Sequence, residues 1–317
     1  MKNHKYKILL SIVLIVISYG FIIYRITDFI KLHKIPKSIF QITKTDFIIL
    51  TIVLLLMPLN WFLESVKWSE LIKPIEELNR KKSFKAVLSG ITVGIFTPNR
   101  IGEIGGRVLF LEKVNQTYGI ITTWLGSFSQ FIVTISVGII GSITLFAFSL
   151  NSVETDRLFN KTSIISLSTI LIFLLWAYFN SHKASKLLVR IPFLKLKEEQ
   201  LSLLSTTPQK KLLLILVFSL LRYIIFSFQF YLLLLFFNID ISILEGFTSI
   251  SLIYLCTTLI PTTTLAELGV RGSVAIFILG AYSSNIPGII FTSFSLWFIN
   301  LAIPSLFGSI FLLKNKT

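Results

Sequence analysis

The chain has 317 residues, of which 54% are hydrophobic and only 14% are charged, and its mean hydropathy is +0.81. This composition excludes a soluble globular protein, which needs more polar surface, and is typical of a polytopic membrane protein. The formal net charge is +15, but the Lys and Arg residues stand in short blocks between apolar segments. That placement indicates membrane topology and contact with anionic lipid rather than binding of nucleic acid.

Six apolar stretches are long enough to cross a bilayer of about 30 Å. They lie near residues 8–24, 46–63, 120–150, 162–180, 212–236 and 286–313. The first stretch lacks a convincing small-residue cleavage site, so we expect a retained helix and not a signal peptide. The segment 64–85 follows the second stretch and mixes Trp68, Leu71 and Ile72 with charges. It is predicted to form an amphipathic helix on the cytoplasmic surface of the membrane.

Two further apolar stretches, 86–112 and 247–284, are interrupted in the middle by Pro, Gly, hydroxyl and charged residues. A helix of about 12 residues rises about 18 Å, so each arm of such a stretch reaches only the middle of the bilayer. We expect each stretch to turn back as a re-entrant hairpin. The predicted fold class is therefore an all-α polytopic membrane protein with about six full transmembrane helices and two re-entrant (broken) helical hairpins.

The distribution of basic residues supports hairpins that turn back. Lys2, Lys5 and Lys7 place the N-terminus in the cytoplasm. The strongly basic connector 183–211 is cytoplasmic only if the broken stretches do not cross fully. Only the basic loop at 31–44 departs from the positive-inside rule. Both termini are therefore expected in the cytoplasm.

The two broken stretches contain the same charged pattern, which reads Glu, aliphatic residue, Gly, any residue, Arg. The first copy begins at Glu103 and the second at Glu267, so the two glutamates are 164 positions apart. Each half of the chain, about 1–150 and about 162–317, then holds three crossings and one hairpin. Because an odd number of crossings turns the second half upside down, we expect an inverted repeat within a single integral membrane domain, 1–317.

The charged side chains of the two copies are candidate binding residues. If the first copy is helical, Arg100, Glu103 and Arg107 lie on one face, and Glu103 can pair with either arginine. Glu267 and Arg271 form an i, i+4 pair in the second copy. Ionisable side chains inside a membrane usually mark a working site, and helix breaks beside arginines attract an anion such as phosphate. The alternative is that each Glu and Arg neutralise each other and only hold the hairpin together.

Proline and glycine mark both helix breaks. Pro98 precedes the first copy of the pattern and Pro261 precedes the second. Glycines at the breaks have no side chain, which permits close helix approach and lets a backbone N–H face a ligand. These glycines are Gly102, Gly105, Gly106, Gly269 and Gly272.

Arg222 stands in the middle of the fifth predicted span. It could counter Glu103 or Glu267, line a path together with Gln229, or serve as a structural counter-ion, and the sequence leaves these alternatives open. Single amides elsewhere in the spans are expected to form interhelical hydrogen bonds. They are Asn60, Gln130 and Asn300.

No metal or cofactor is expected. The single cysteine, Cys256, lies in an apolar run, and His4, His33 and His182 lie in connecting segments. A metal site would need a cluster of such ligands. One pair of carboxylates without a nucleophile or a cofactor motif also gives little support for an intramembrane enzyme.

Both broken stretches resemble the signatures of a known family. Residues 97–103 read Thr-Pro-Asn-Arg-Ile-Gly-Glu and are followed by Gly-Arg-Val at 106–108 and by the basic Lys113. This segment is similar to the Pro-Gly-Arg-aliphatic-Gly-Glu signature of the lysylphosphatidylglycerol synthase transmembrane region, also called the flippase-like domain family. Residues 261–272 are similar to the second signature of that family, Pro, Ser/Thr, Gly-Gly-aliphatic-Gly-Val-Arg-Glu.

The resemblance covers essentially the whole chain and has two departures. Asn99 replaces a glycine, and Gly272 replaces the glutamate after the second arginine, while a glutamate stands earlier at Glu267. The resemblance implies a multi-pass protein of the bacterial inner membrane, related to the part of aminoacyl-phosphatidylglycerol synthases that moves the modified lipid between leaflets. It implies translocation without synthesis, because no soluble aminoacyl-transfer domain is expected, and hence no enzyme.

We therefore expect a transporter, or flippase, for a lipid with an anionic or aminoacylated phospholipid headgroup. Its partners would be membrane lipids and not nucleic acid, and a homo-oligomer is left open. The alternative is a non-transporting membrane partner that organises or regulates a lipid- or glycan-modifying enzyme. The expected substrate-binding residues are Arg100, Glu103, Arg107, Arg222, Glu267 and Arg271.

Overall fold

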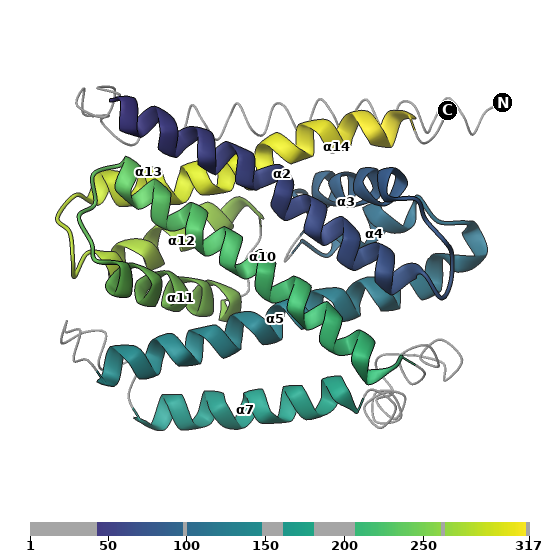
Figure 1. Ribbon diagram of the computed structural model, residues 1–317, viewed down its shortest axis with the longest axis horizontal. Coiled ribbons are helices and arrows are strands. Elements are labelled where there is room, and N and C mark those ends of the chain that lie inside the picture. The colour runs from purple at the N-terminus through teal and green to yellow at the C-terminus, as the bar shows by residue number, and fades with distance from the viewer. Residues whose placement is uncertain (1–42, 98–99, 148–160, 181–206, 261–263, 315–317) are drawn as a thin grey trace.

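The structure is a computed structural model, and its described part is built of helices joined by turns, without a strand among the described residues (Figure 1). The described residues are 43–97, 100–147, 161–180, 207–260 and 264–314. The predicted first span, 8–24, lies outside them, as do Pro98, Pro261 and most of the basic connector. The all-α membrane class predicted from the sequence is confirmed for the described residues.

Five described helical segments are long and apolar enough to cross a membrane. They correspond to the last five spans predicted from hydropathy. The segments are α2 (Lys44–Ile72), η3–α5 (Lys113–Asn115 and Gln116–Ala147), α7 (Lys161–Phe179), α10 (Gln209–Phe236) and the continuous run α13 (Ile286–Trp297), η5 (Phe298–Ala302) and α14 (Ile303–Lys314). In the last of these, η5 is a single π-helical stretch directly before Pro304. A proline has no N–H to donate, which accounts for a local change of hydrogen bonding there.

Helix α2 is longer than hydropathy predicts. It continues past Pro58 to Ile72, so the predicted surface helix over 64–85 is wrong for its first part. Trp68 is fully buried, because this turn of α2 packs against the protein and not on the lipid headgroups. The consequence is that several polar side chains between residues 60 and 68 lie inside the molecule. Those on the buried face are Asn60, Glu64, Lys67 and Trp68.

Each broken stretch folds as a pair of short helices. The first pair is α3 (Arg80–Gly94) with α4 (Gly102–Val108), and the second is α11 (Ile243–Leu259) with α12 (Thr264–Leu279). With 15 residues, α3 rises about 23 Å, which is less than the thickness of the hydrocarbon core. In Figure 1 the pair α3–α4 lies in the right half and α11–α12 in the left half, with their inner ends facing the middle of the molecule.

The long helices hold both pairs in place. Helix α3 packs against α4 and α14, α11 packs against α12 and α5, and α2 packs against α10 at the centre. Glycines allow close contact at both junctions: a Cβ atom on Gly308 would lie 2.0 Å from the carbonyl oxygen of Leu88, and one on Gly138 would lie 2.7 Å from Cβ of Leu255. Thr92 adds a hydrogen bond from its hydroxyl to the carbonyl of Ser305, at 2.7 Å. Such close packing fixes where the inner ends of α4 and α12 lie.

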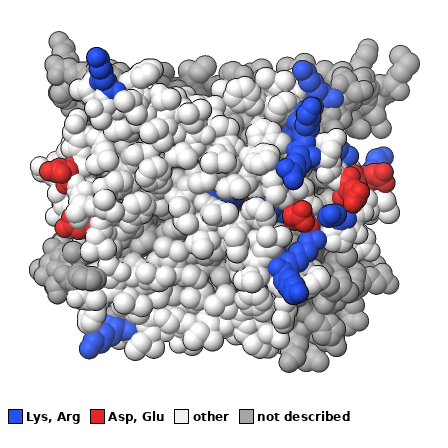
Figure 2. Space-filling model, in the orientation of Figure 1, with Lys and Arg blue, Asp and Glu red and all other residues white. Residues whose placement is uncertain are grey.

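The outside of the molecule is mostly uncharged. Figure 2 shows a broad white surface across the middle, with charged side chains gathered toward the two ends. Large apolar side chains are exposed on this surface, for example Phe47, Ile172 and Leu213, at 67%, 69% and 56%. Continuous apolar surface of this kind is what the hydrocarbon of a bilayer covers. The helices therefore run between the two charged ends.

Candidate functional site

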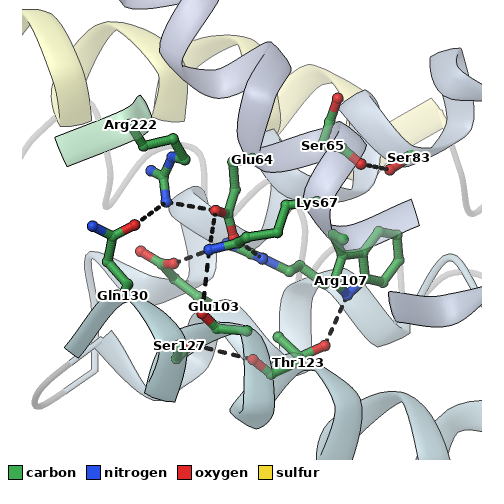
Figure 3. Close-up of polar contacts among 12 residues, drawn as sticks. Glu64, Ser65, Lys67, Ser83, Glu103, Arg107, Thr123, Ser127, Gln130 and Arg222 are labelled. Carbon is green, nitrogen blue, oxygen red and sulfur yellow. Dashed lines mark hydrogen bonds and ion pairs between the residues drawn. The ribbon is translucent and has the colours of Figure 1, made fainter. Parts of the chain in front are cut away.

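Glu64 of α2 is a buried carboxylate that three cationic side chains share. Its Oε1 accepts a hydrogen bond from Arg107 Nη1 at 2.6 Å. Its Oε2 accepts from Arg222 Nη1 and pairs with Lys67 Nζ at 2.8 Å. Figure 3 shows Arg107 and Arg222 reaching Glu64 from two sides. A buried charge is stable only when it has partners of opposite charge. Glu64, Lys67, Arg107 and Arg222 provide such partners for one another, and this Glu64 cluster joins α2, α4 and α10.

The predicted pairing in the first copy is confirmed. Glu103 forms an ion pair with Arg100 and another with Arg107, whose Nη2 lies 3.3 Å from Glu103 Oε2. Arg107 therefore bridges two carboxylates, Glu103 on its own helix and Glu64 on α2. Arg100 stands just before α4 with a φ of 58°, in the left-handed region where a non-glycine residue is uncommon. Strained backbone of this kind clusters at functional sites.

Arg222 has a partner that the sequence did not suggest. Its hydrogen bonds go to Glu64, to Asn60 Oδ1 at 3.0 Å and to Gln130 Oε1 at 3.3 Å, and not to Glu103 or Glu267. Its guanidinium carbon lies 5.2 Å from the centre of the Trp61 ring. Gln229, the proposed companion of Arg222, instead donates to the carbonyl oxygen of Val53.

Lys67 lies beside Glu64 at the centre of the molecule. Its side chain is 1% exposed, and Nζ donates to the carbonyl oxygen of Gly126 at 3.2 Å and to Ser219 Oγ at 3.4 Å. The lysine thus connects α2 to α5 and α10. All three of its donors have a partner when the carboxylate of Glu64 is counted.

The second copy forms the ion pair expected from its spacing. Arg271 Nη2 lies 2.9 Å from Glu267 Oε1 within α12. The two side chains differ in exposure, at 28% for Arg271 and 10% for Glu267. Arg271 is the member of the pair that reaches the cavity described next.

One cavity of about 330 Å³ is lined by charged residues from both broken stretches. Its lining includes five cationic side chains and two carboxylates, so its formal net charge is three positive charges. The charged lining residues are Glu64, Lys67, Arg100, Glu103, Arg107, Arg222 and Arg271. Glu267 is not among the lining residues. The volume suits a small polar headgroup.

The sequence matches the family model for the lysylphosphatidylglycerol synthase TM region over residues 8–308. The chain belongs to this family. No match was found among curated proteins or among solved structures. Membership supports a multi-pass membrane protein with a function related to membrane lipid. Among the described residues of this family member, no three His, Cys, Asp or Glu side chains come together as a possible metal site.

The glycines of the family signatures have different surroundings. A Cβ atom on Gly106 would lie 2.7 Å from the Cα of Gly90, and one on Gly102 would lie 2.6 Å from the carbonyl oxygen of Val93. These two glycines permit the close approach of α3 and α4. The expectation of close helix approach is wrong for Gly105, Gly269 and Gly272, where a Cβ atom would meet nothing within 4 Å. That a backbone N–H faces a ligand at these positions stays a prediction. Pro98 and Pro261 lie outside the described residues.

Sequence reasoning missed Glu64 and Lys67, which are central to the cluster. The apolar stretch ends at residue 63, so the sequence pattern predicts that both residues lie on a surface helix. A signal was nevertheless present: Asn60, Glu64 and Trp68 recur at helical spacing, so they form one face with Lys67. A polar and aromatic face on a helix that continues an apolar span indicates a buried polar site.

Proposed function

We propose that this protein is a flippase-like lipid transporter, which moves a phospholipid headgroup between the leaflets of the bacterial inner membrane. The observation that carries the proposal is the cavity with three net positive charges, to which both broken stretches contribute. A cationic site of this kind, enclosed by an apolar exterior, attracts a lipid phosphate while the acyl chains remain in hydrocarbon. On this account the protein is not an enzyme and acts on membrane lipids.

The arrangement of helices supports an inverted repeat. Adding 164 to the residue numbers maps α2 onto α10, α3 onto α11, α4 into α12, and α5 onto the run from α13 to α14. The helix contacts agree with this mapping. The contact between α3 and α14 corresponds to the contact between α11 and α5. On this proposal the two halves, about 1–150 and about 162–317, have opposite orientations in the membrane, and their hairpins re-enter it from opposite faces. Alternating access between such halves is the common mode of transporters with inverted repeats.

The distribution of charge supports cytoplasmic termini. The last residues of α2 and α14 and the first residues of α3 and α10 all lie at the right end in Figure 1. The basic residues at this end include Lys73, Arg80, Lys210 and Lys314. By the positive-inside rule this end faces the cytoplasm.

The arginines divide into two groups by exposure. Arg107 and Arg222 are 5% and 8% exposed and are held by Glu64. Arg100 and Arg271 are 26% and 28% exposed, and each pairs with one glutamate of its own broken stretch. On this account the accessible pair, one arginine from each stretch, makes the main contact with the phosphate, and the buried pair shapes the cavity, with the free Nε of Arg107 as a further donor.

One observation favours the alternative, a non-transporting partner of a lipid- or glycan-modifying enzyme. The Glu64 cluster is largely satisfied by its own members, as a structural cluster would be. On this reading the charges only hold the helices together, and no headgroup enters the cavity.

A leaflet-resolved lipid assay in proteoliposomes tests the proposal. We expect lipid to cross faster with the protein than in protein-free vesicles, and the Arg271→Gln variant to slow this movement at least about tenfold. Arg80→Gln is the matched control, because Arg80 is exposed and does not line the cavity. Lipid movement equal to that of protein-free vesicles would contradict the proposal.

A further inference from the structure

The charged groups of the cavity specify which headgroups it can hold. Both carboxylates in the lining are already paired. Glu64 uses Oε1 for Arg107 and Oε2 for Lys67 and Arg222. The Glu64 side chain is only 5% exposed, so an ammonium group has little access to either oxygen.

The second carboxylate, Glu103, has an ion-pair partner for each oxygen but is more exposed than Glu64, at 18% against 5%, and its Oε1 accepts no hydrogen bond. Glu103 pairs with Arg100 through Oε1 and with Arg107 through Oε2. Glu267, the carboxylate of the other broken stretch, pairs with Arg271 and does not line the cavity. A cationic headgroup would therefore enter a site with a net charge of three positive charges, in which each carboxylate of the lining already has cationic partners.

The rings of Trp61 and Phe226 are not free to bind a cationic headgroup. Arg222 already lies over the rings of Trp61 and Phe226, at 5.2 and 5.9 Å from their centres. Tyr223 and Tyr254 pack against each other edge to face, with ring centres 5.6 Å apart. Recognition of an amine by cation–π contact needs an open ring face, and Arg222 takes that place at Trp61 and Phe226.

Three arginines still have N–H groups to offer to an anion. The Nε atoms of Arg100, Arg107 and Arg271 are buried and have no hydrogen-bond partner. Arg107 is 4% exposed as a residue, and all three arginines line the cavity. A phosphate accepts charge-assisted hydrogen bonds from such donors.

Hydroxyl side chains in the lining act as acceptors toward a ligand. Ser127 donates its proton to the carbonyl oxygen of Thr123 at 3.3 Å, and Thr257 donates to that of Ile253 at 2.8 Å. Thr134 donates to the carbonyl oxygen of Gln130 at 3.0 Å. With their protons used, these side chains present lone pairs to the cavity and suit a ligand that carries hydroxyl donors.

We propose that the cavity selects a phosphate headgroup that carries hydroxyl groups and no cationic group. The lipid nature of this ligand rests on the proposed function, whereas the headgroup chemistry rests on the paired carboxylates, the free guanidinium N–H groups and the hydroxyl acceptors. Of the two headgroup types expected from the sequence, the anionic one fits and the aminoacylated one does not.

Binding titrations on the purified protein test this specificity. The probes are phosphatidylglycerol, phosphatidylethanolamine and lysyl-phosphatidylglycerol with identical acyl chains, followed by native mass spectrometry. We expect phosphatidylglycerol to bind at least about tenfold more tightly than the other two, because only it combines hydroxyl groups with a net negative charge. Equal or tighter binding of the lysyl lipid would overturn the proposal.

Variants test whether the lipid binds in this cavity, and a soluble phosphate tests whether the ligand is a lipid headgroup or a free phosphate compound. Arg271→Gln should lower the affinity for phosphatidylglycerol and reduce the preference, while Arg80→Gln should change neither. A preference that is undiminished in Arg271→Gln would overturn the assignment to this cavity. Glycerol 1-phosphate should compete with phosphatidylglycerol. Binding of glycerol 1-phosphate without binding of the lipid would assign the cavity to a soluble phosphate and overturn lipid selectivity.

The result is separable from that of the transport assay. Selective binding without movement between leaflets would contradict the proposed function and leave the headgroup selectivity in place. Movement of all three lipids at equal rates would support transport and contradict the selectivity.

Discussion

Arg107 Nη1 and Glu64 Oε1 lie 2.6 Å apart, although the two residues are 43 positions apart in the sequence. This contact attaches the first broken stretch to the long helix α2. Arg222 of α10 binds the other oxygen of the same carboxylate. A single side chain therefore joins a short helix of the first half to the central helices of both halves.

Glu64→Gln should destabilise the protein strongly. The substitution keeps the shape of the side chain but leaves Lys67, Arg107 and Arg222 buried without their shared anion. Breaking a buried ion pair by removing one partner costs about 3–5 kcal/mol. Thermal unfolding in detergent measures the loss, and Glu77→Gln, at an exposed position, is the control. Equal unfolding midpoints for the two variants would show that the cluster is not required for stability.

Gly106→Ala and Gly105→Ala should have opposite effects. A Cβ atom on Gly106 meets backbone of Gly90 and Ser89 at 2.7 and 2.8 Å, which cannot move without separating α3 from α4. We expect a loss of about 1–3 kcal/mol. A Cβ atom on Gly105 meets nothing within 4 Å, so alanine should stabilise α4 by about 0.5–1 kcal/mol. Unfolding midpoints of the two variants measure the difference, and a Gly106→Ala protein as stable as wild type would contradict the packing.

The sequence predicted the local features of this structure and missed the central contact. Apolar stretches located the described spans, because a long hydrophobic run is a strong signal. Spacing of three and four residues predicted the pairs of Glu103 and of Glu267, since such pairs depend only on helix geometry. Glu64 and Arg222 are 158 positions apart, so their contact depends on how α2 packs against α10. The ends of helices are also poorly marked by hydropathy, which is why the continuation of α2 past residue 63 escaped prediction.

Acid should weaken the link between the end of α2 and the start of α5 through Glu76. Burial raises the pKa of this carboxyl, but hydrogen bonds from the backbone N–H of Glu112, from Asn115 and from Lys82 outweigh it and lower the pKa below its ordinary value. A lowered pKa stabilises the folded protein above the pKa of the unfolded chain, about 4.3. This stabilisation is lost as the pH falls through the pKa of the folded protein.

The variant Glu76→Gln isolates this effect. The difference in unfolding midpoint between wild type and Glu76→Gln should be largest near neutral pH and should shrink as the pH falls below about 4. A difference that stays constant or grows in acid would show that the carboxylate of Glu76 is not stabilised by its hydrogen bonds.

The two functional accounts differ most clearly in their expectations for an exchange of charges. Glu103 and Arg107 are a poor pair to exchange, because a glutamate at 107 would face Glu64. Glu267 and Arg271 form no other ion pair among the described residues and keep an i, i+4 pair when exchanged. If the charges only hold the helix, the exchanged protein should function as before.

Lipid movement between leaflets in proteoliposomes that contain the double variant Glu267→Arg, Arg271→Glu is the most direct test of a functional cavity. Correct folding is established first by an unfolding midpoint close to that of wild type. We predict a rate at least about tenfold below that of wild type, because the exchange replaces a cation in the lining by an anion. A folded double variant that moves lipid at the wild-type rate would contradict the account.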